Sequence, residues 1–154
     1  MASVDIDPGQ AARRDWMSLL AKAERSALEA AWAGLADKPD WRWLRKPETG
    51  LVMVRGRAGG TGAAFNLGEM TVTRCALRTD AGHSGHAYVA GRDREHARLA
   101  ALFDALLQDE ARRSALTEAV LTPIAEARAA GRRQRDAETA ATKVEFFTMV
   151  RGED

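Results

Sequence analysis

The sequence is poor in cysteine, proline and aromatic residues, and the single cysteine excludes whole classes of protein. Cys75 alone cannot form an internal disulfide framework, a zinc thiolate cluster or an iron-sulfur centre. No stretch approaches the ~20 apolar residues that a membrane helix requires, and the N-terminus lacks the basic and apolar regions of a secretory signal. We therefore expect a cytoplasmic chain that is neither exported nor membrane-spanning.

The sequence also has no large excess of positive or negative charge. The 154 residues include 23 Lys plus Arg and 22 Asp plus Glu, so the totals lack the electrostatic footprint of a nucleic-acid binder. Arginine, the better bidentate partner for phosphate, supplies nearly all of the basic residues, although GC-rich coding would give the same bias. Any anion site must therefore be local, and the length predicts one domain, residues 1–154.

Helical spacing dominates the first 40 residues. Asp7 and Pro8 are typical of a helix start, and Arg13 is expected on the polar side of the helix that follows. Ser26 with Glu29 forms a second capping pattern, which predicts that the helix bends or restarts there. The apolar face of the segment comprises Trp16, Leu19, Leu20, Ala23 and Ala27.

Strand-like segments occupy the middle of the chain. Residues 41–45, 51–55, 69–78 and 85–90 are rich in strand-forming side chains, and Thr79 to Gly82 is a turn cluster that predicts an antiparallel hairpin. Helices before and after these strands complete an α+β fold, with a central antiparallel sheet of about four strands flanked by N-terminal and C-terminal helices.

Two helices are predicted after the sheet. Asp93 should cap a strongly amphipathic helix, and Thr122–Pro123 should begin a last helix that runs to about Lys143 with few large apolar residues. This helix and an apolar tail, about residues 123–154, are predicted to contact a partner or another part of the chain. The candidate interface residues in the tail are Phe146, Phe147, Met149 and Arg151.

The segment 55–62, Arg-Gly-Arg-Ala-Gly-Gly-Thr-Gly, is the most unusual in the chain. Its backbone N–H groups and arginine side chains suit an anion or a protein partner, whereas the alternative is a tight glycine turn with arginines in water. Neither the Walker nor the dinucleotide-binding motif is met, because no Gly-Lys-Ser/Thr and no helix start follow. The candidate residues are Arg57, Gly59, Gly60 and Gly62.

Glu69, Arg74 and Arg92 are further candidates for anion or partner binding, with inter-strand ion pairing as the plainer alternative. His83 and His86 lie three residues apart in a predicted strand, on opposite faces, so the pattern predicts no metal site. No residue completes a catalytic triad, and Cys75 is typical of a small core residue. We identify no catalytic residue.

Three segments together are similar to the PhnG family of the carbon-phosphorus lyase core complex. They are Glu48–Val52 continuing through 57–62 to Gly68–Arg74, then Val89–Asp93 with the helix behind it, and Val144–Gly152. The likeness extends from Arg14 to the C-terminus. It is weakest in the first dozen residues and in the helix rich in Ala, Arg and Glu.

The resemblance implies an accessory subunit in the catabolism of organic phosphonates. Its partners would be PhnH, PhnI and PhnJ, with the ATPase-like PhnL as a further one. The complex would transfer the ribose 5-triphosphate moiety of ATP to a phosphonate and displace adenine, with Mg expected beside ATP. The chain would then be part of a transferase, not catalytic alone and without a cofactor of its own. The alternative is a free-standing nucleotide- or RNA-binding domain.

Overall fold

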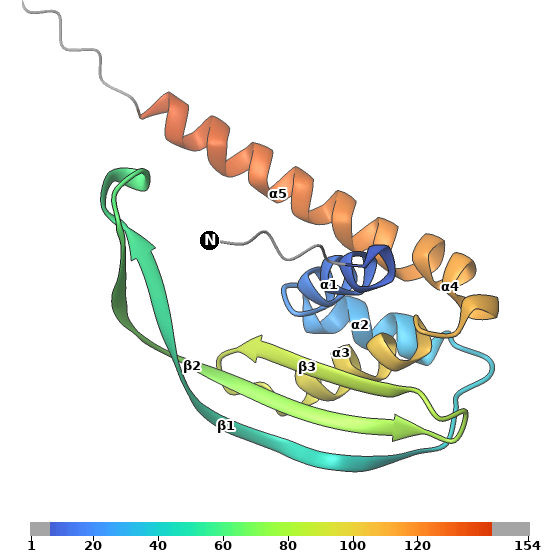
Figure 1. The fold of residues 1–154 in the computed structure, drawn as a ribbon. Coiled ribbons are helices and arrows are strands. Elements are labelled where there is room, and N and C mark those ends of the chain that lie inside the picture. The colour runs from blue at the N-terminus through green and yellow to red at the C-terminus, as the bar shows by residue number, and fades with distance from the viewer. Residues whose placement is uncertain (1–6, 143–154) are drawn as a thin grey trace, which may run out of the picture.

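The computed structural model describes residues 7–142, so the predicted interface residues Phe146, Phe147, Met149 and Arg151 lie outside the described part. Three antiparallel strands form one sheet in the order β1 (Trp41–Arg57), β2 (Ala64–Thr79) and β3 (Ser84–Ala90). Helices α1 (Pro8–Leu20), α2 (Arg25–Ala33) and α3 (Arg94–Leu106) lie on one face of this sheet (Figure 1). The predicted α+β fold is confirmed.

The first two predicted strands are parts of one long strand, β1. Lys46–Gly50 reads like a turn in the sequence, but the chain continues through it with shifts in register on either side of Arg45. Pro47 is tolerated there because β1 is an edge strand, where a residue without an N–H group breaks no obligatory ladder bond. The predicted turn at Thr79–Gly82 is confirmed, and Gly82 adopts the positive φ of 92° that such a turn requires.

Helix α3 is the centre of the core. Asp93 caps it as predicted, its carboxylate accepting a hydrogen bond from the His96 N–H at 2.9 Å. The helix is buried along most of its length because the sheet covers one side while α1 and α2 cover another. β3 approaches it so closely that a Cβ at Gly85 would overlap the backbone carbonyl of Ala101. No larger residue than glycine fits at that crossing.

One predicted helix start differs from the structure and another is confirmed. Ser26 lies inside α2, whose N-terminal flanking residue is Glu24, so the capping-box prediction there was wrong although the helix does restart. α5 (Thr122–Ala141) begins at Thr122 as predicted. It follows directly from α4 (Glu110–Leu116) through a π-helical turn, Thr117–Leu121, and neither α4 nor this turn was predicted. Pro123 is tolerated because it lies in the first turn of α5, where a residue without an N–H group removes no hydrogen bond within that helix.

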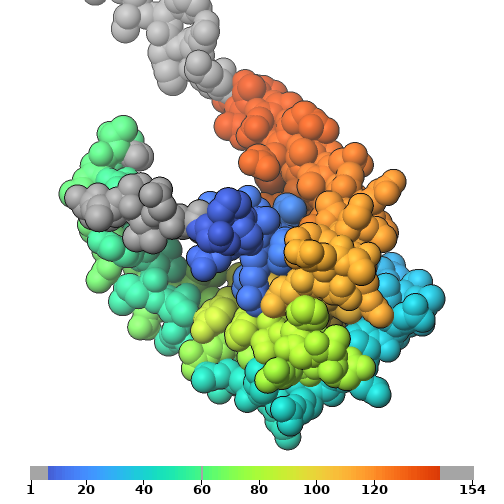
Figure 2. Space-filling view, turned by 45° about the vertical axis from the view of Figure 1, so that its right-hand side comes forward, coloured from blue at the N-terminus to red at the C-terminus, as the bar shows by residue number. Residues whose placement is uncertain are grey.

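The three longest elements, β1, β2 and α5, project from the helical body. The β1–β2 pair extends beyond the end of β3 and curves away from the sheet, and α5 rises from the body toward the same side in both views (Figures 1 and 2). Within α5 only Ile124 is buried, which agrees with its predicted lack of large apolar residues. No helix in residues 7–142 is long and apolar enough to cross a membrane.

Candidate functional site

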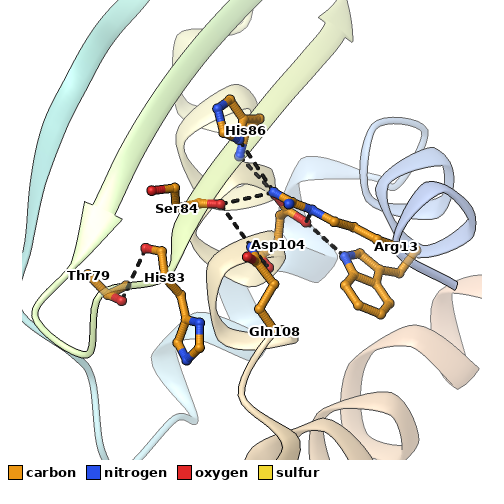
Figure 3. A network of polar contacts seen from close by, with 8 residues as sticks. Arg13, Thr79, His83, Ser84, His86, Asp104 and Gln108 are labelled. Carbon is orange, nitrogen blue, oxygen red and sulfur yellow. Dashed lines mark hydrogen bonds and ion pairs between the residues drawn. The ribbon is translucent and has the colours of Figure 1, made fainter. Parts of the chain in front are cut away.

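A buried carboxylate, Asp104, joins three elements of the fold. It lies on α3 with no exposed surface, although the rest of that helix face is apolar. Its Oδ1 accepts hydrogen bonds from Arg13 Nε at 3.1 Å and Trp16 Nε1 at 2.9 Å. Its Oδ2 accepts from an Arg13 terminal nitrogen at 2.7 Å and from the His86 backbone N–H at 2.9 Å. Arg13 was expected on the polar face of α1, but it points inward to this carboxylate (Figure 3).

The four donors occupy all the acceptor sites that Asp104 has to offer. The Arg13 guanidinium binds both carboxylate oxygens, the bidentate geometry that makes such pairs strong. A carboxylate engaged in this way has no free lone pair with which to accept a proton from a substrate. Its role is structural, because its hydrogen bonds hold α1 and β3 against α3.

The same network reaches the end of β3. The Ser84 carbonyl accepts hydrogen bonds from Arg13 at 2.9 Å and from Gln108 Nε2 at 2.8 Å (Figure 3). The His86 side chain is exposed, with its Nδ1 3.4 Å from an Arg13 terminal nitrogen. His86 is exposed, whereas Arg13, Ser84 and Gln108 are half-buried.

The segment of the β1–β2 pair beyond β3, residues 50–71, forms a two-stranded ribbon with exposed apolar side chains. Sequence reasoning did not single these residues out. The available signal was the run Leu51-Val52-Met53-Val54, because consecutive apolar residues in a strand place apolar side chains on both faces. The exposed apolar residues of the ribbon are Leu51, Met53, Phe65, Leu67 and Met70.

The glycine-arginine segment forms the tip of this ribbon, so Arg57, Gly59, Gly60 and Gly62 do lie together. Gly59 has a φ of 60°, a conformation that favours glycine, and a Cβ at Gly62 would lie 2.9 Å from the Ala58 carbonyl oxygen. The Arg57 guanidinium donates a hydrogen bond to the Gly62 carbonyl at 2.9 Å, which closes the turn. These contacts favour the tight-turn interpretation for the backbone, and an anion- or partner-binding role of the exposed tip stays a prediction.

The remaining candidates lie elsewhere on the sheet. Arg74 is ten residues along β2 from Ala64, on the order of 30 Å of extended strand. Its Nε donates to Glu48 at 2.7 Å, the inter-strand ion pair of the plainer alternative. Hydrogen bonds from Arg45 and Arg74 lower the pKa of Glu48 below its usual value.

Glu69 lies opposite Met53 in the ribbon, and Arg92 is exposed in the connection between β3 and α3. The candidates are therefore spread over three places and do not converge on one pocket. A role of Glu69, Arg74 and Arg92 in binding an anion or a partner stays a prediction.

The reactive side chains in the described region serve packing. Cys75 is buried, its thiol lies 3.2 Å from the Ala97 carbonyl, and burial raises its pKa to about 11. His96 is buried with its Nε2 2.8 Å from the Leu20 carbonyl, which makes it a satisfied core residue. No group of three or more metal-ligating side chains occurs within residues 7–142.

Comparison with known proteins covers nearly the whole chain. The sequence model of a family described as "Phosphonate metabolism protein PhnG" matches residues 11–152. A curated relative from Rhizobium meliloti (strain 1021), named alpha-D-ribose 1-methylphosphonate 5-triphosphate synthase subunit PhnG, is 50% identical over 153 residues. That alignment covers 99% of this chain and 97% of the relative. Neither match supports the alternative of a free-standing nucleotide- or RNA-binding domain.

Proposed function

The chain belongs to the PhnG family of phosphonate metabolism proteins, and on that premise we propose that it is an accessory subunit of an α-D-ribose 1-methylphosphonate 5-triphosphate synthase. The observation that carries the proposal is the 50% identity to a subunit of that name across 99% of this chain. The synthase would act in the catabolism of organic phosphonates.

An accessory role, as opposed to a catalytic one, is supported by the state of the chain's own reactive groups. Asp104 is saturated by four hydrogen bonds and has no exposed surface. The raised pKa of Cys75, about 11, leaves little thiolate at neutral pH. Arg74 already shares a carboxylate with Arg45. By contrast, the ribbon exposes apolar surface that suits contact with another subunit, so the chain would contribute by binding.

The partners we propose are the PhnH, PhnI and PhnJ types of subunit, with PhnL as a further partner. ATP, with Mg, and a phosphonate would be substrates of the assembled complex, and this chain would bind no cofactor by itself. In the reaction, the phosphonate would replace adenine at the ribose of ATP while the triphosphate is retained. The groups that perform this displacement would come from the partner subunits.

Co-expression tests the proposal directly. The chain should be produced with PhnH-, PhnI- and PhnJ-type subunits of the same organism, purified through a tag on this chain, and weighed by native mass spectrometry. We expect a complex with a fixed number of copies of each bound subunit. A chain that purifies alone at its own mass of 16.7 kDa under these conditions would contradict the proposal.

A further inference from the structure

The ribbon of residues 50–71 lies outside the hydrophobic core that residues 7–142 form. Its five exposed apolar residues keep large fractions of their surface in solvent: Leu51 62%, Met53 53%, Phe65 46%, Leu67 65% and Met70 39%. Single exposed apolar residues are ordinary on a protein surface, but a contiguous set marks an interaction site. A two-stranded ribbon without a third strand or a covering helix is also only marginally stable in water.

The exposed residues occupy both faces of the ribbon, which follows from the strand register. Directly opposed residues of an antiparallel pair project to the same face. Thr49 is opposite Thr73, which is buried on the helix-facing side of the sheet. Because side chains alternate along a strand, Leu51 and Met53, two and four residues after Thr49, lie on that same side.

The other three apolar residues lie on the opposite face. Met70 pairs with Val52, and Phe65 pairs with Gly56. A Cβ built at Gly56 would lie 3.7 Å from the Leu67 side chain, which places Leu67 on that face as well. A partner must therefore contact the ribbon from both sides to cover its apolar residues.

The ribbon has two edges, β1 and the part of β2 that extends beyond β3. Within the ribbon the pairing shifts register once, between Val54 and Arg55. Such an irregularity discourages another strand from adding to an exposed edge. The exposed apolar side chains lie on the faces of the ribbon, and these are the surfaces that a partner must cover.

The charge of the outer part of the ribbon also indicates which kind of protein can bind it. The ribbon contains two basic residues, Arg55 and Arg57, and one acidic residue, Glu69, which lies further from the tip. Both arginines are exposed at the tip, where Arg57 holds the turn closed. Two copies that apposed their ribbons would bring like charges together, so charge complementarity favours a different protein with acidic side chains near the tip.

We propose that residues 50–71 insert into an apolar cleft of another subunit of the synthase, one that contacts both faces of the ribbon and carries acidic side chains around Arg55 and Arg57. This inference rests on the proposed function and names the surface that performs it. Leu51 and Met53 would be covered by one wall of the cleft, and Phe65, Leu67 and Met70 by the other.

The experiment compares matched substitutions in the co-expression system described above. Met53→Asp and Leu67→Asp each place a charge on one face of the ribbon. Leu44→Asp is the control, because Leu44 is 52% exposed on β1 but lies in the three-stranded part of the sheet. Thermal unfolding of each purified variant, with the unmodified chain alongside, shows that the fold is retained.

We expect each ribbon variant to recover at least about tenfold less of the partner subunit, and Leu44→Asp to recover as much as the unmodified chain. Arg55→Glu combined with Arg57→Glu should also weaken recovery, most at low salt. Ribbon variants that recover partners normally would overturn this inference and leave the proposed function standing.

Two further outcomes are also decisive. If the unmodified chain recovers no subunit, the proposed function fails and this inference fails with it. If instead the unmodified chain forms a homodimer that Met53→Asp and Leu67→Asp dissociate, the ribbon is an interface between copies, and the proposed different partner is wrong.

Discussion

The substitution Asp104→Asn tests whether the buried carboxylate holds the fold together. Asp104 has no exposed surface and accepts hydrogen bonds from Arg13, Trp16 and the backbone N–H of His86. Asparagine has nearly the same shape, but it removes the negative charge and turns one of the two acceptor atoms into a donor. Two of the four incoming donors would then face an N–H group.

The expected loss follows from the exposure of the two partners. Breaking a buried ion pair costs about 3–5 kcal/mol, because the remaining charge is left without a partner. The Arg13 side chain is 33% exposed and can turn toward water, so we take the low end of that range, about 3 kcal/mol. For a domain of this size such a loss lowers Tm by roughly 6–12 °C.

Chemical denaturation of the purified chain with urea measures this loss, provided that the slope of the transition is unchanged. Asp136→Asn is the matched control, because Asp136 is exposed on α5, and its effect should stay within about 0.5 kcal/mol. If Asp104→Asn also changes the free energy of unfolding by less than about 0.5 kcal/mol, the carboxylate does not fasten α1 and β3 to α3.

Three other predictions concern single positions. Gly85→Ala should leave little folded protein, by a loss above about 4 kcal/mol, whereas Gly50→Ala, with no atom within 4 Å of the new Cβ, should fold normally as judged by circular dichroism. The raised pKa of buried Cys75 predicts negligible labelling by a thiol reagent at pH 8 until the chain is unfolded, and rapid labelling of the native chain would refute it. The pKa of Glu48 is lowered, mainly by the hydrogen bond that Arg45 donates to it. The Glu48 carboxylate therefore stabilises the fold above the pKa that it has in the unfolded chain, and this stabilisation is lost as the pH falls through the lower pKa of the folded state. NMR titration should accordingly show a midpoint below the usual value that rises in Arg45→Ala, and an unchanged midpoint would contradict the pairing.

Much of the fold could be predicted because its elements carry local signals. Asp93 and the amphipathic pattern behind it mark α3, and the turn residues from Thr79 to Gly82 mark the β2–β3 hairpin. The continuity of β1 could not be predicted, because Pro47 and its neighbours look like a turn unless β1 is known to be an edge strand. Strand order is a property of the tertiary structure.

The candidate site was predicted less completely, for a related reason. Arg13 and Asp104 are 91 residues apart, and no local pattern pairs them. The sequence offered one signal, which is Asp104 inside an otherwise apolar helix face. A carboxylate buried there needs hydrogen-bond donors from elsewhere in the fold. The ribbon could be inferred only in part. The run from Leu51 to Val54 shows that both faces are apolar, but it does not show that they stay exposed among residues 7–142.

We infer that the chain serves the synthase by binding its other subunits and not by chemistry of its own. The most direct measurement is adenine released from ATP in the presence of methylphosphonate and Mg by the reconstituted subunits, with this chain present, omitted or supplied as the ribbon variant Met53→Asp. We predict release with the unmodified chain, at least about tenfold less without it, and a deficit with Met53→Asp that excess variant chain restores. Equal release with and without the chain would show that the synthase does not need this subunit.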